Sequence, residues 1–272
     1  MKNRLDIILT ERGYYPSREK AKAAVMAGIV FVNGQKVDKA GTSVDYEAEI
    51  YIKENICPYV SRGGLKLEKA LKEFKIDLTD AVCVDIGAST GGFTDCMLTR
   101  GAAKVFAIDV GYGQLDFKLR TDPRVVNMEK INIRYLDTAL IDKETSFIAI
   151  DVSFISLKLV LPVAASLLIP GGKIVCLVKP QFEAGREQVG KNGIVREKSV
   201  HEEVLRNVAL YGRMNDLSVC GITFSPITGA KGNIEYLMYL QKEKSCEDTW
   251  DEPEIAEVVR LSHEMLSNKT IG

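Results

Sequence analysis

Four charged residues stand beside apolar segments, where catalytic groups of open α/β sheets are found. Asp151 and Lys179 each lie at the end of an apolar segment that reads as a β-strand. Glu235 opens a further segment of this kind, and Lys66 lies on a helical pattern before the first strand. A lysine held against a carboxylate can move a proton or stabilise a developing oxyanion. The four residues are therefore candidates for acid–base chemistry.

Each of these residues also has an ordinary structural explanation. Asp151 could cap a helix, Lys66 could be a surface cation, and Lys179 could extend its amine from a strand end into water. An extended segment places Glu235 on the same face as Leu237 and Tyr239, and burying an unpaired carboxylate is costly. Either the strand begins after Glu235 and leaves it solvated, or buried cations pair with it.

A glycine-rich stretch, "VDIGASTGGFTD", reads as strand, turn and helix. Its glycines at 87, 91 and 92 differ from the G-x-G-x-x-G spacing of the dinucleotide fingerprint. Asp109 ends the following strand, 22 residues after Gly87, and an acid there can accept hydrogen bonds from ribose hydroxyls. The pattern suits either NAD or S-adenosylmethionine (SAM).

Seven apolar segments separated by crossovers predict an α/β fold with a doubly wound, mostly parallel sheet. The sixth and seventh segments are joined by "SPITGAKGN" without a helix, so we expect the seventh strand to run antiparallel. The segments are residues 81–87, 104–110, 124–128, 146–152, 173–179, 217–224 and 234–240.

Residues 1–58 form a separate small α+β module with its linker, and residues 59–272 form the larger domain. Apolar spacing predicts a first helix that ends at Gly13, and Ser17 is a suitable N-cap for a second. Asn33-Gly34 predicts a type I′ hairpin turn. Residues 1–40 hold eight basic and four acidic side chains, a net charge of +4, which suits a polyanion-binding surface.

Bulk composition excludes several classes of protein. The chain has 36 Lys and Arg against 37 Asp and Glu, so no global charge attracts nucleic acid. The uncharged stretch 159–170, which contains Pro162, is too short to span a bilayer, and the N-terminus does not read as a signal peptide. The six cysteines are scattered without a CxxC pair, which argues against a metal site or disulfide framework and suits a reducing cytoplasm.

Motifs across the chain resemble known families. "DIGASTGGF" resembles motif I of SAM-dependent methyltransferases, and the four charged residues resemble the K-D-K-E tetrad of FtsJ-like ribose 2′-O-methyltransferases. The N-terminal module resembles the S4-type RNA-binding domain, and stretches such as "YVSRGGLKLEKAL" are similar to the TlyA-type rRNA methyltransferases, whose relatives are often labelled hemolysin. The resemblance implies a Rossmann-like SAM-methyltransferase sheet of seven strands behind an S4-like domain.

The resemblance also implies roles for individual residues, with SAM as cofactor, ribosomal RNA as partner and no metal. Lys66, Asp151, Lys179 and Glu235 would be catalytic. The SAM site would comprise Asp85, Gly87, Ser89, Gly91, Gly92, Phe93, Asp109, Asn132 and Asp151. RNA would contact Arg4, Arg12, Ser17, Arg18, Lys20, Lys36 and Arg186.

The implied reaction is methyl transfer to a ribose 2′-oxygen, which family resemblance suggests is that of a cytidine. Lys179 would act as base or oxyanion-stabilising cation, Asp151 would hold it beside the methyl donor, and the other pair would orient them. "DVSF" lacks the prolines of the N/D-P-P-Y/F clamp of adenine amino-methyltransferases. Cytosine C5 chemistry needs a thiol nucleophile, and Cys83 and Cys176 read as core.

Two other functions stay open: a non-catalytic RNA-binding or ribosome-assembly factor with a methyltransferase fold, and a membrane-active protein. The intact tetrad argues against the first, and the absence of a basic amphipathic helix argues against the second. We expect the polar loop of residues 181–197, with Arg186, Lys191 and Arg196, to cover the substrate. His201, at the start of the following helix, is expected at the surface.

Overall fold

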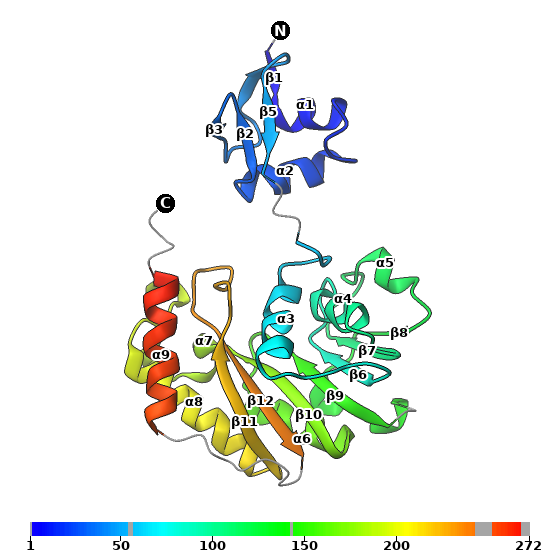
Figure 1. The fold of residues 1–272 in the computed structure, drawn as a ribbon, viewed down its shortest axis with the longest axis vertical. Helices are drawn as coiled ribbons and strands as arrows, with labels where there is room; N and C mark the ends of the chain where they lie inside the picture. The colour runs from blue at the N-terminus through cyan, green and yellow to red at the C-terminus, as the bar shows by residue number, and fades with distance from the viewer. Residues whose placement is uncertain (1, 54–56, 142–143, 243–251, 268–272) are drawn as a thin grey trace. The chain divides into compact units, whose positions relative to one another are not determined.

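The computed structural model of the chain describes residues 2–53, 57–141, 144–242 and 252–267. The chain divides into two compact units, Met1–Ile56 and Cys57–Gly272 (Figure 1). Each unit has its own hydrophobic core.

The N-terminal unit packs two helices against short strands. Ser17 caps the second helix as predicted, since its hydroxyl accepts a hydrogen bond from the Lys20 N–H at 3.4 Å. Asn33 and Gly34 both have positive φ, as a type I′ turn requires. The elements are β1 (Lys2–Arg4), α1 (Leu5–Glu11), α2 (Arg18–Met26), β2 (Val30–Val32), β3 (Gln35–Lys36), β4 (Ser43–Asp45) and β5 (Ile50–Ile52).

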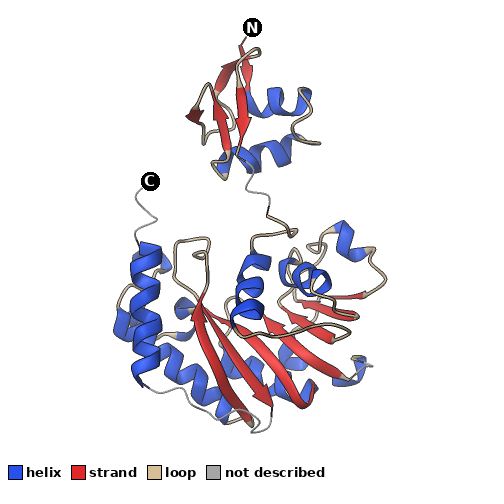
Figure 2. Cartoon of the chain, in the orientation of Figure 1, coloured by secondary structure: helices blue, strands red, loops and turns tan. Residues whose placement is uncertain are grey.

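The C-terminal unit is built on a seven-stranded sheet with the order β11-β12-β10-β9-β6-β7-β8 (Figure 2). The five strands from β10 to β8 pair in parallel, and β12 pairs antiparallel with both β10 and β11. The predicted α/β class, seven strands and antiparallel last strand are confirmed. The strands are β6 (Val82–Ile86), β7 (Lys104–Asp109), β8 (Val125–Glu129), β9 (Thr145–Ile150), β10 (Leu168–Val178), β11 (Leu217–Phe224) and β12 (Tyr236–Lys242).

Helices cover both faces of this sheet, and alternate strand residues enter the two cores. On β10, Cys176 and Val178 pack on the face covered by α6 and α8, whereas Val175 and Leu177 pack on the face covered by α3 and α4. The helices are α3 (Gly63–Glu73), α4 (Gly92–Thr99), α5 (Phe117–Arg120), α6 (Leu157–Leu167), α7 (Pro180–Glu183), α8 (Lys198–Arg213) and α9 (Glu252–Ser267), with 3₁₀ turns at Ile133–Tyr135, Thr138–Leu140, Arg186–Gln188 and Lys191–Gly193.

Two further features concern membrane spans and cysteines. Among the described residues, no helix has the length and apolar character needed to cross a bilayer. Cys220, however, is disulfide-bonded, which the scattered cysteine spacing did not predict. Cys57, Cys83, Cys96 and Cys176 are free.

Candidate active site

The direction of β12 brings Glu235 to the same edge of the sheet as Lys179. Parallel strands β9 and β10 end at one edge, and Asp151 and Lys179 directly follow them. Because β12 is antiparallel to β10, its first residue, Tyr236, pairs with Val178 at the end of β10. The strand therefore begins one residue after Glu235, yet Glu235 is buried rather than solvated.

Lys66 reaches this edge from α3. The helix buries Leu67, Ala70 and Leu71 in the core and also buries Lys66, whose amine lies 2.6 Å from Glu235 Oε2. The alternative interpretation of Lys66 as a solvated surface cation is therefore wrong. Its partner is 169 residues away in the chain.

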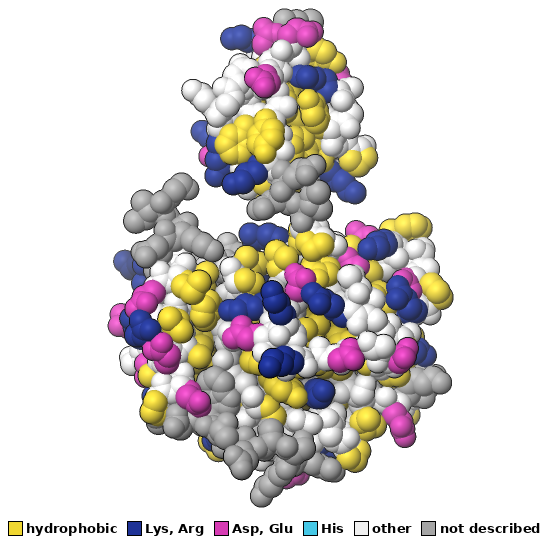
Figure 3. Space-filling model, viewed as in Figure 1, with side chains coloured by type: hydrophobic (Ala, Val, Ile, Leu, Met, Phe, Trp, Pro, Cys, Tyr) yellow, Lys and Arg dark blue, Asp and Glu magenta, His cyan; other side chains and the backbone are white. Residues whose placement is uncertain are grey.

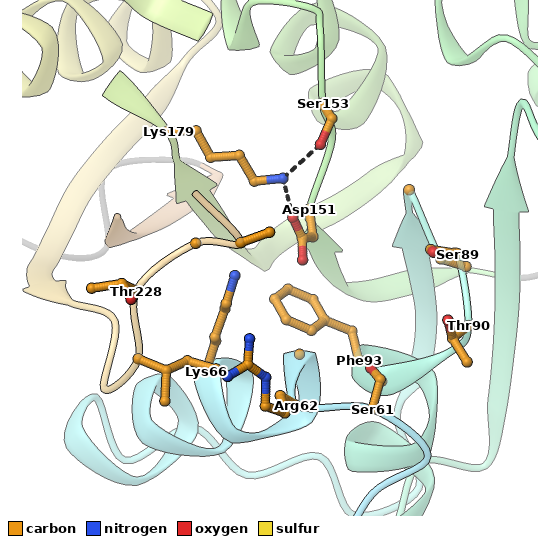
Figure 4. A pocket seen from close by; sticks show the side chains of 17 residues that line it. Ser61, Arg62, Lys66, Ser89, Thr90, Phe93, Asp151, Ser153, Lys179 and Thr228 are labelled. Atoms are coloured by element: carbon orange, nitrogen blue, oxygen red, sulfur yellow. Dashed lines mark hydrogen bonds and ion pairs between the residues drawn. The ribbon is translucent and has the colours of Figure 1, made fainter. Parts of the chain in front are cut away.

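A second ion pair joins Lys179 to Asp151, with 2.6 Å between Nζ and Oδ1. Lys179 Nζ also donates to the hydroxyl of Ser153 at 2.9 Å. Pro180 follows Lys179 and favours the extended conformation that Lys179 has, with φ −110° and ψ 101°. Figure 4 shows Lys66 pointing into the cavity that the Lys179–Asp151 pair also lines.

Burial of these four charged side chains is energetically unfavourable unless the charges are paired. Desolvating an ion costs several kcal/mol, and only close pairing with good geometry offsets that cost. Each of the two buried lysines has a carboxylate at 2.6 Å. The arrangement is an electrically balanced set of two cations and two anions at one cavity wall.

The glycine-rich turn forms one side of the cavity. Gly87 has φ +88°, and a Cβ there would lie 2.5 Å from the carbonyl oxygen of Asp151, so no other residue fits without displacing the end of β9. Ser89, Gly92 and Phe93 also line this side. The turn thus keeps backbone close to Asp151 and leaves space in front of it.

A larger cavity of about 730 Å³ continues from this turn along the ends of β7 and β8. Asp109 lines it and accepts hydrogen bonds from the N–H groups of Ser89 at 2.8 Å and Gly111 at 2.7 Å. Asn132 lines it as well, with its side chain accepting from the Arg134 N–H at 3.1 Å. Both polar side chains are fixed by the backbone around them.

Two residues assigned to the cofactor lie behind the turn rather than in the cavities described here. Asp85 is fully buried and accepts a hydrogen bond from the Thr94 hydroxyl at 2.6 Å. Burial raises the pKa of Asp85 to about 7, against the lowering effect of that hydrogen bond. Gly91 has φ +97°, and a Cβ there would meet the Leu119 side chain. Both residues therefore stabilise the conformation of the glycine-rich turn.

A third cavity, of about 510 Å³, lies on the other side of the tetrad. Lys66, Lys179 and Glu235 line it together with the loops of residues 181–193 and 229–233. Lys66 and Lys179 thus line both this cavity and the one beside the glycine turn. We name this third space the loop-side cavity.

Phe154 is a residue that sequence reasoning did not single out. It is 90% exposed, has φ +64°, and its ring lies 5.0 Å from that of Phe182. An exposed phenylalanine in the left-handed region is uncommon and marks functional sites. Phe154 lines both the loop-side cavity and the larger cavity. Its only sequence signal was its position three residues after Asp151.

The segment that carries Asp151 and Phe154 is tied to α7. Glu183 accepts hydrogen bonds from the Ser156 hydroxyl at 2.6 Å and the Leu157 N–H at 2.8 Å. Burial raises the pKa of Glu183, and these two bonds oppose that shift. The carboxylate thus joins the residues after β9 to those after β10.

The prediction for His201 was wrong. Its side chain is fully buried, donates from Nε2 to the Val195 carbonyl at 3.1 Å, and contacts the Tyr236 hydroxyl through Nδ1 at 2.7 Å. Burial lowers the pKa of His201 to about 4. Val204, Leu205 and Val208 lie on the same buried stripe of α8, so helical spacing could have indicated the burial.

Neither cysteine considered for nucleophilic chemistry lines the cavities described here. Cys83 and Cys176 are fully buried in the two cores. Burial raises the pKa of Cys83 to about 12 and that of Cys176 further. Such thiols lack the thiolate character that nucleophilic attack requires.

Comparison with known proteins settles the family. A family model described as "FtsJ-like methyltransferase" matches residues 59–242, and one described as "S4 domain" matches residues 3–50. The chain belongs to the FtsJ-like methyltransferases. It is therefore a methyltransferase with an N-terminal S4 domain, as the motifs predicted.

Relatives at high identity agree on the TlyA type. The methyltransferase is 51% identical to "Putative rRNA methyltransferase YqxC" of Bacillus subtilis, over 98% of this chain and 96% of that one. It is 41% identical to "16S/23S rRNA (cytidine-2'-O)-methyltransferase TlyA" of Mycobacterium tuberculosis, over 88% and 90%. A solved structure named "Putative hemolysin from Streptococcus thermophilus" has 48% identity and a TM-score of 0.81, covering 100% of this chain and 99% of that one.

The S4 domain of the methyltransferase carries an organised pair of arginines. Buried Asp6 accepts from Arg4 Nε at 3.0 Å and from Arg18 Nη2 at 3.0 Å, while both arginines stay half-exposed. The hydrogen bond from Arg4 is the main cause that lowers the pKa of Asp6 to about 2. Figure 3 shows Lys and Arg side chains beside hydrophobic ones on the visible face of this domain.

The remaining basic residues predicted to contact RNA differ in how much they bond to the rest of the protein. Arg12 donates to the Ala48 carbonyl at 2.9 Å, so part of its guanidinium holds the domain together. Lys20 and Lys36 are exposed, and the Lys36 side chain lies over Gly28. Arg186 is exposed in a 3₁₀ turn of the methyltransferase unit and lines none of the three cavities.

Proposed function

We propose that this protein transfers the methyl group of SAM to a ribose 2′-hydroxyl of ribosomal RNA, on a cytidine. Residues 1–58 bind the RNA and residues 59–272 carry the chemistry. The observation that supports this function best is the pair of buried ion pairs between two cavities. The naming of the TlyA relatives supports rRNA and cytidine as substrate.

The glycine-turn side suits the methyl donor. Gly87 allows the turn to approach the Asp151 backbone, Gly92 allows it to approach Ser61 and Gly64, and Ser89 and Phe93 line the cavity beside it. Asp109 and Asn132 present oxygen atoms along the larger cavity, suited to the ribose and the adenine end. SAM supplies an already activated methyl group, so the protein must supply an aligned oxygen nucleophile. Asp85 and Gly91 act indirectly, by supporting the turn.

The loop-side cavity suits the acceptor nucleotide. A 2′-hydroxyl is a poor nucleophile until its proton is removed or strongly hydrogen-bonded. Lys179 takes that proton as the neutral amine, or stabilises the developing oxyanion as the ammonium, and Asp151 fixes its Nζ at the cavity wall. Lys66 with Glu235 holds the second cation in place. The exposed ring of Phe154 offers a stacking surface for a nucleobase that has left its helix.

In the S4 domain, Arg4, Arg18, Lys20 and Lys36 are exposed cations for phosphates of structured RNA. Arg12 and Ser17 act mainly by holding and capping the elements that present those cations. Arg186 contributes a cation from the methyltransferase unit.

The test is methyl transfer from labelled SAM to rRNA prepared from cells that lack the gene, with ribose-methylation mapping of the product. We expect 2′-O-methylcytidine with the wild-type protein. Lys179→Ala is expected to lower kcat at least 100-fold with unchanged binding of SAM and RNA, since base and oxyanion groups contribute about 10²- to 10⁴-fold. Lys173→Ala is the control, because Lys173 lies on β10 six residues before Lys179 and lines none of the three cavities.

The results of this test distinguish the proposed methyl transfer from the two alternative functions. Wild-type protein that binds SAM and RNA without methylating any rRNA would favour the non-catalytic assembly factor. Full activity of Lys179→Ala would remove Lys179 from the reaction. Lysis of membranes by the purified protein would favour a membrane-active function.

A further inference from the structure

Asn233 lies two residues before Glu235 and has no role in the chemistry described above. Its side chain is buried, at 2% exposure, and lines the loop-side cavity. The amide oxygen accepts from the Val195 N–H at 3.0 Å, and the amide nitrogen donates to the Gly193 carbonyl at 2.8 Å. Both polar ends of one side chain thus hold the backbone of a segment about 40 residues away.

The same residue also holds the other loop of the cavity. The backbone carbonyl of Asn233 accepts from the Gly229 N–H at 2.9 Å. A Cβ on Gly229 would lie 2.5 Å from Glu235 Oε1, so this loop passes directly over the catalytic carboxylate. Asn233 therefore joins two loops that form the cavity wall opposite the glycine turn.

The carbonyl of Val195 is held as well as its N–H. This oxygen can only accept, so His201 Nε2 carries the proton, and His201 Nδ1 accepts from the Tyr236 hydroxyl. Tyr236 follows Glu235 directly. Residues on both sides of Glu235 thus fix the two peptide groups that flank the Cα of Val195, one through Asn233 directly and the other through His201.

We propose that Asn233 is a positioning residue for the RNA acceptor: it fixes the loop wall of the cavity against Glu235 without taking part in SAM binding. The role rests on the proposed function, because it assigns the loop-side cavity to the ribose. If the buried amide only stabilised the fold, its removal would lower the affinity for both substrates and the stability of the whole domain. A positioning residue affects the acceptor alone.

The experiment compares Asn233→Ala with Asn215→Ala in the full-length protein. Asn215 also donates from its amide to a backbone carbonyl, that of Tyr211 at 2.8 Å, but lines none of the three cavities. We expect Asn233→Ala to lower kcat/KM for rRNA at least tenfold and leave the SAM Kd within twofold. Asn215→Ala is expected to change neither quantity by more than twofold.

Hydrogen exchange provides a readout that does not depend on catalysis. The Val195 amide is expected to be protected in the wild type and in Asn215→Ala, and to exchange faster in Asn233→Ala. Tyr236→Phe, which removes only one hydroxyl, covers the case in which Asn233→Ala fails to fold. It is expected to lower kcat/KM for rRNA by about three- to fivefold with the SAM Kd unchanged.

Failures of the two proposals are distinguishable. An unprotected Val195 amide in the wild type, equal kcat/KM in Asn233→Ala and wild type, or a parallel loss of SAM affinity would overturn the positioning role alone. Wild-type protein without methyl transfer would overturn the proposed function and, with it, the role of Asn233 toward RNA.

Discussion

The two units of the molecule both combine carboxylates with basic side chains but expose them differently. In the S4 domain the carboxylate of Asp6 is fully buried, while Arg4 and Arg18 are 50% and 48% exposed. In the methyltransferase unit both members of each tetrad pair are largely buried. An exposed cation with a buried anchor is arranged to meet an external anion. A buried, balanced set is arranged to act on a group that enters the cavity.

The difference fits the roles proposed for these charges. A phosphate contact needs a cation that reaches water, and pre-ordering by Asp6 would reduce the side-chain entropy lost on RNA binding. Shielding from water strengthens electrostatic interactions, which suits the proposed role of Lys179 toward the ribose oxygen. Four predictions test this contrast, from the largest expected effect to the smallest.

Glu235→Gln should cause the largest change. The substitution keeps the shape of the side chain but leaves Lys66 without its anion, so we expect kcat to fall at least 100-fold under saturating RNA and SAM. The rate of single-turnover methyl transfer measures this change. Glu73→Gln is the control, because Glu73 forms a half-exposed pair with Lys69 at 3.7 Å. Similar rates for both variants would mean that burial of the pair has no catalytic consequence.

Asp6→Asn should weaken RNA binding about tenfold. Its neutral side chain no longer anchors both guanidinium groups, each of which then loses a charge-assisted hydrogen bond of about 1.5–3 kcal/mol. Filter binding of rRNA at fixed salt measures the change, with exposed Asp38→Asn as control. Unchanged affinity would show that Asp6 serves the domain fold and not the RNA surface.

Arg18→Ala should reduce the slope of log K against log[salt] by about one, as expected for the loss of one phosphate contact. Arg12→Ala should change that slope less, because Arg12 is bonded to the Ala48 carbonyl. RNA titrations between 50 and 200 mM salt give the slopes of the two variants for comparison. A larger effect for Arg12 would reverse the assignment of structural and RNA-facing arginines.

Mild acid should remove the stability that neutral His201 contributes to the methyltransferase unit. Below pH 6.5 the unfolded chain protonates His201, which the folded chain leaves neutral until about pH 4, so the contribution of His201 falls across that window. Asp85, whose pKa burial raises to about 7, opposes this loss, because the folded chain binds that proton at a higher pH than the unfolded chain does. Asp6, with its pKa lowered to about 2, contributes stability that is lost only as pH falls through roughly 4 to 2.

His201→Gln preserves a donor and an acceptor without titrating near this pH. On going from pH 7.5 to 5.5, we expect the free energy of unfolding to change by about 1 kcal/mol more favourably in this variant than in the wild type. Urea unfolding at both pH values measures the difference. An equal change in the two proteins would point to another titrating group, such as His263, whose ring centre lies 4.9 Å away.

Local patterns were enough to predict the sheet and the glycine turn. Apolar runs gave the strands, and the short connection before Gly232 gave the direction of β12. The pairing of Lys66 with Glu235 depends on how α3 rotates against β12, which no local pattern contains. His201 was misassigned because its polarity outweighed its position on the apolar stripe of α8. Phe154 could not be identified because exposure of an aromatic ring depends on backbone dihedral angles.

The place of β12 between β10 and β11 has a consequence for biosynthesis. The tetrad is complete only when this late strand inserts, 169 residues after Lys66. At about 5–20 residues per second, a growing polypeptide lacks the full tetrad for roughly 8 to 34 s after Lys66 is added. With the catalytic role proposed for the tetrad, a nascent copy cannot methylate the ribosome that is translating it before Glu235 has been added.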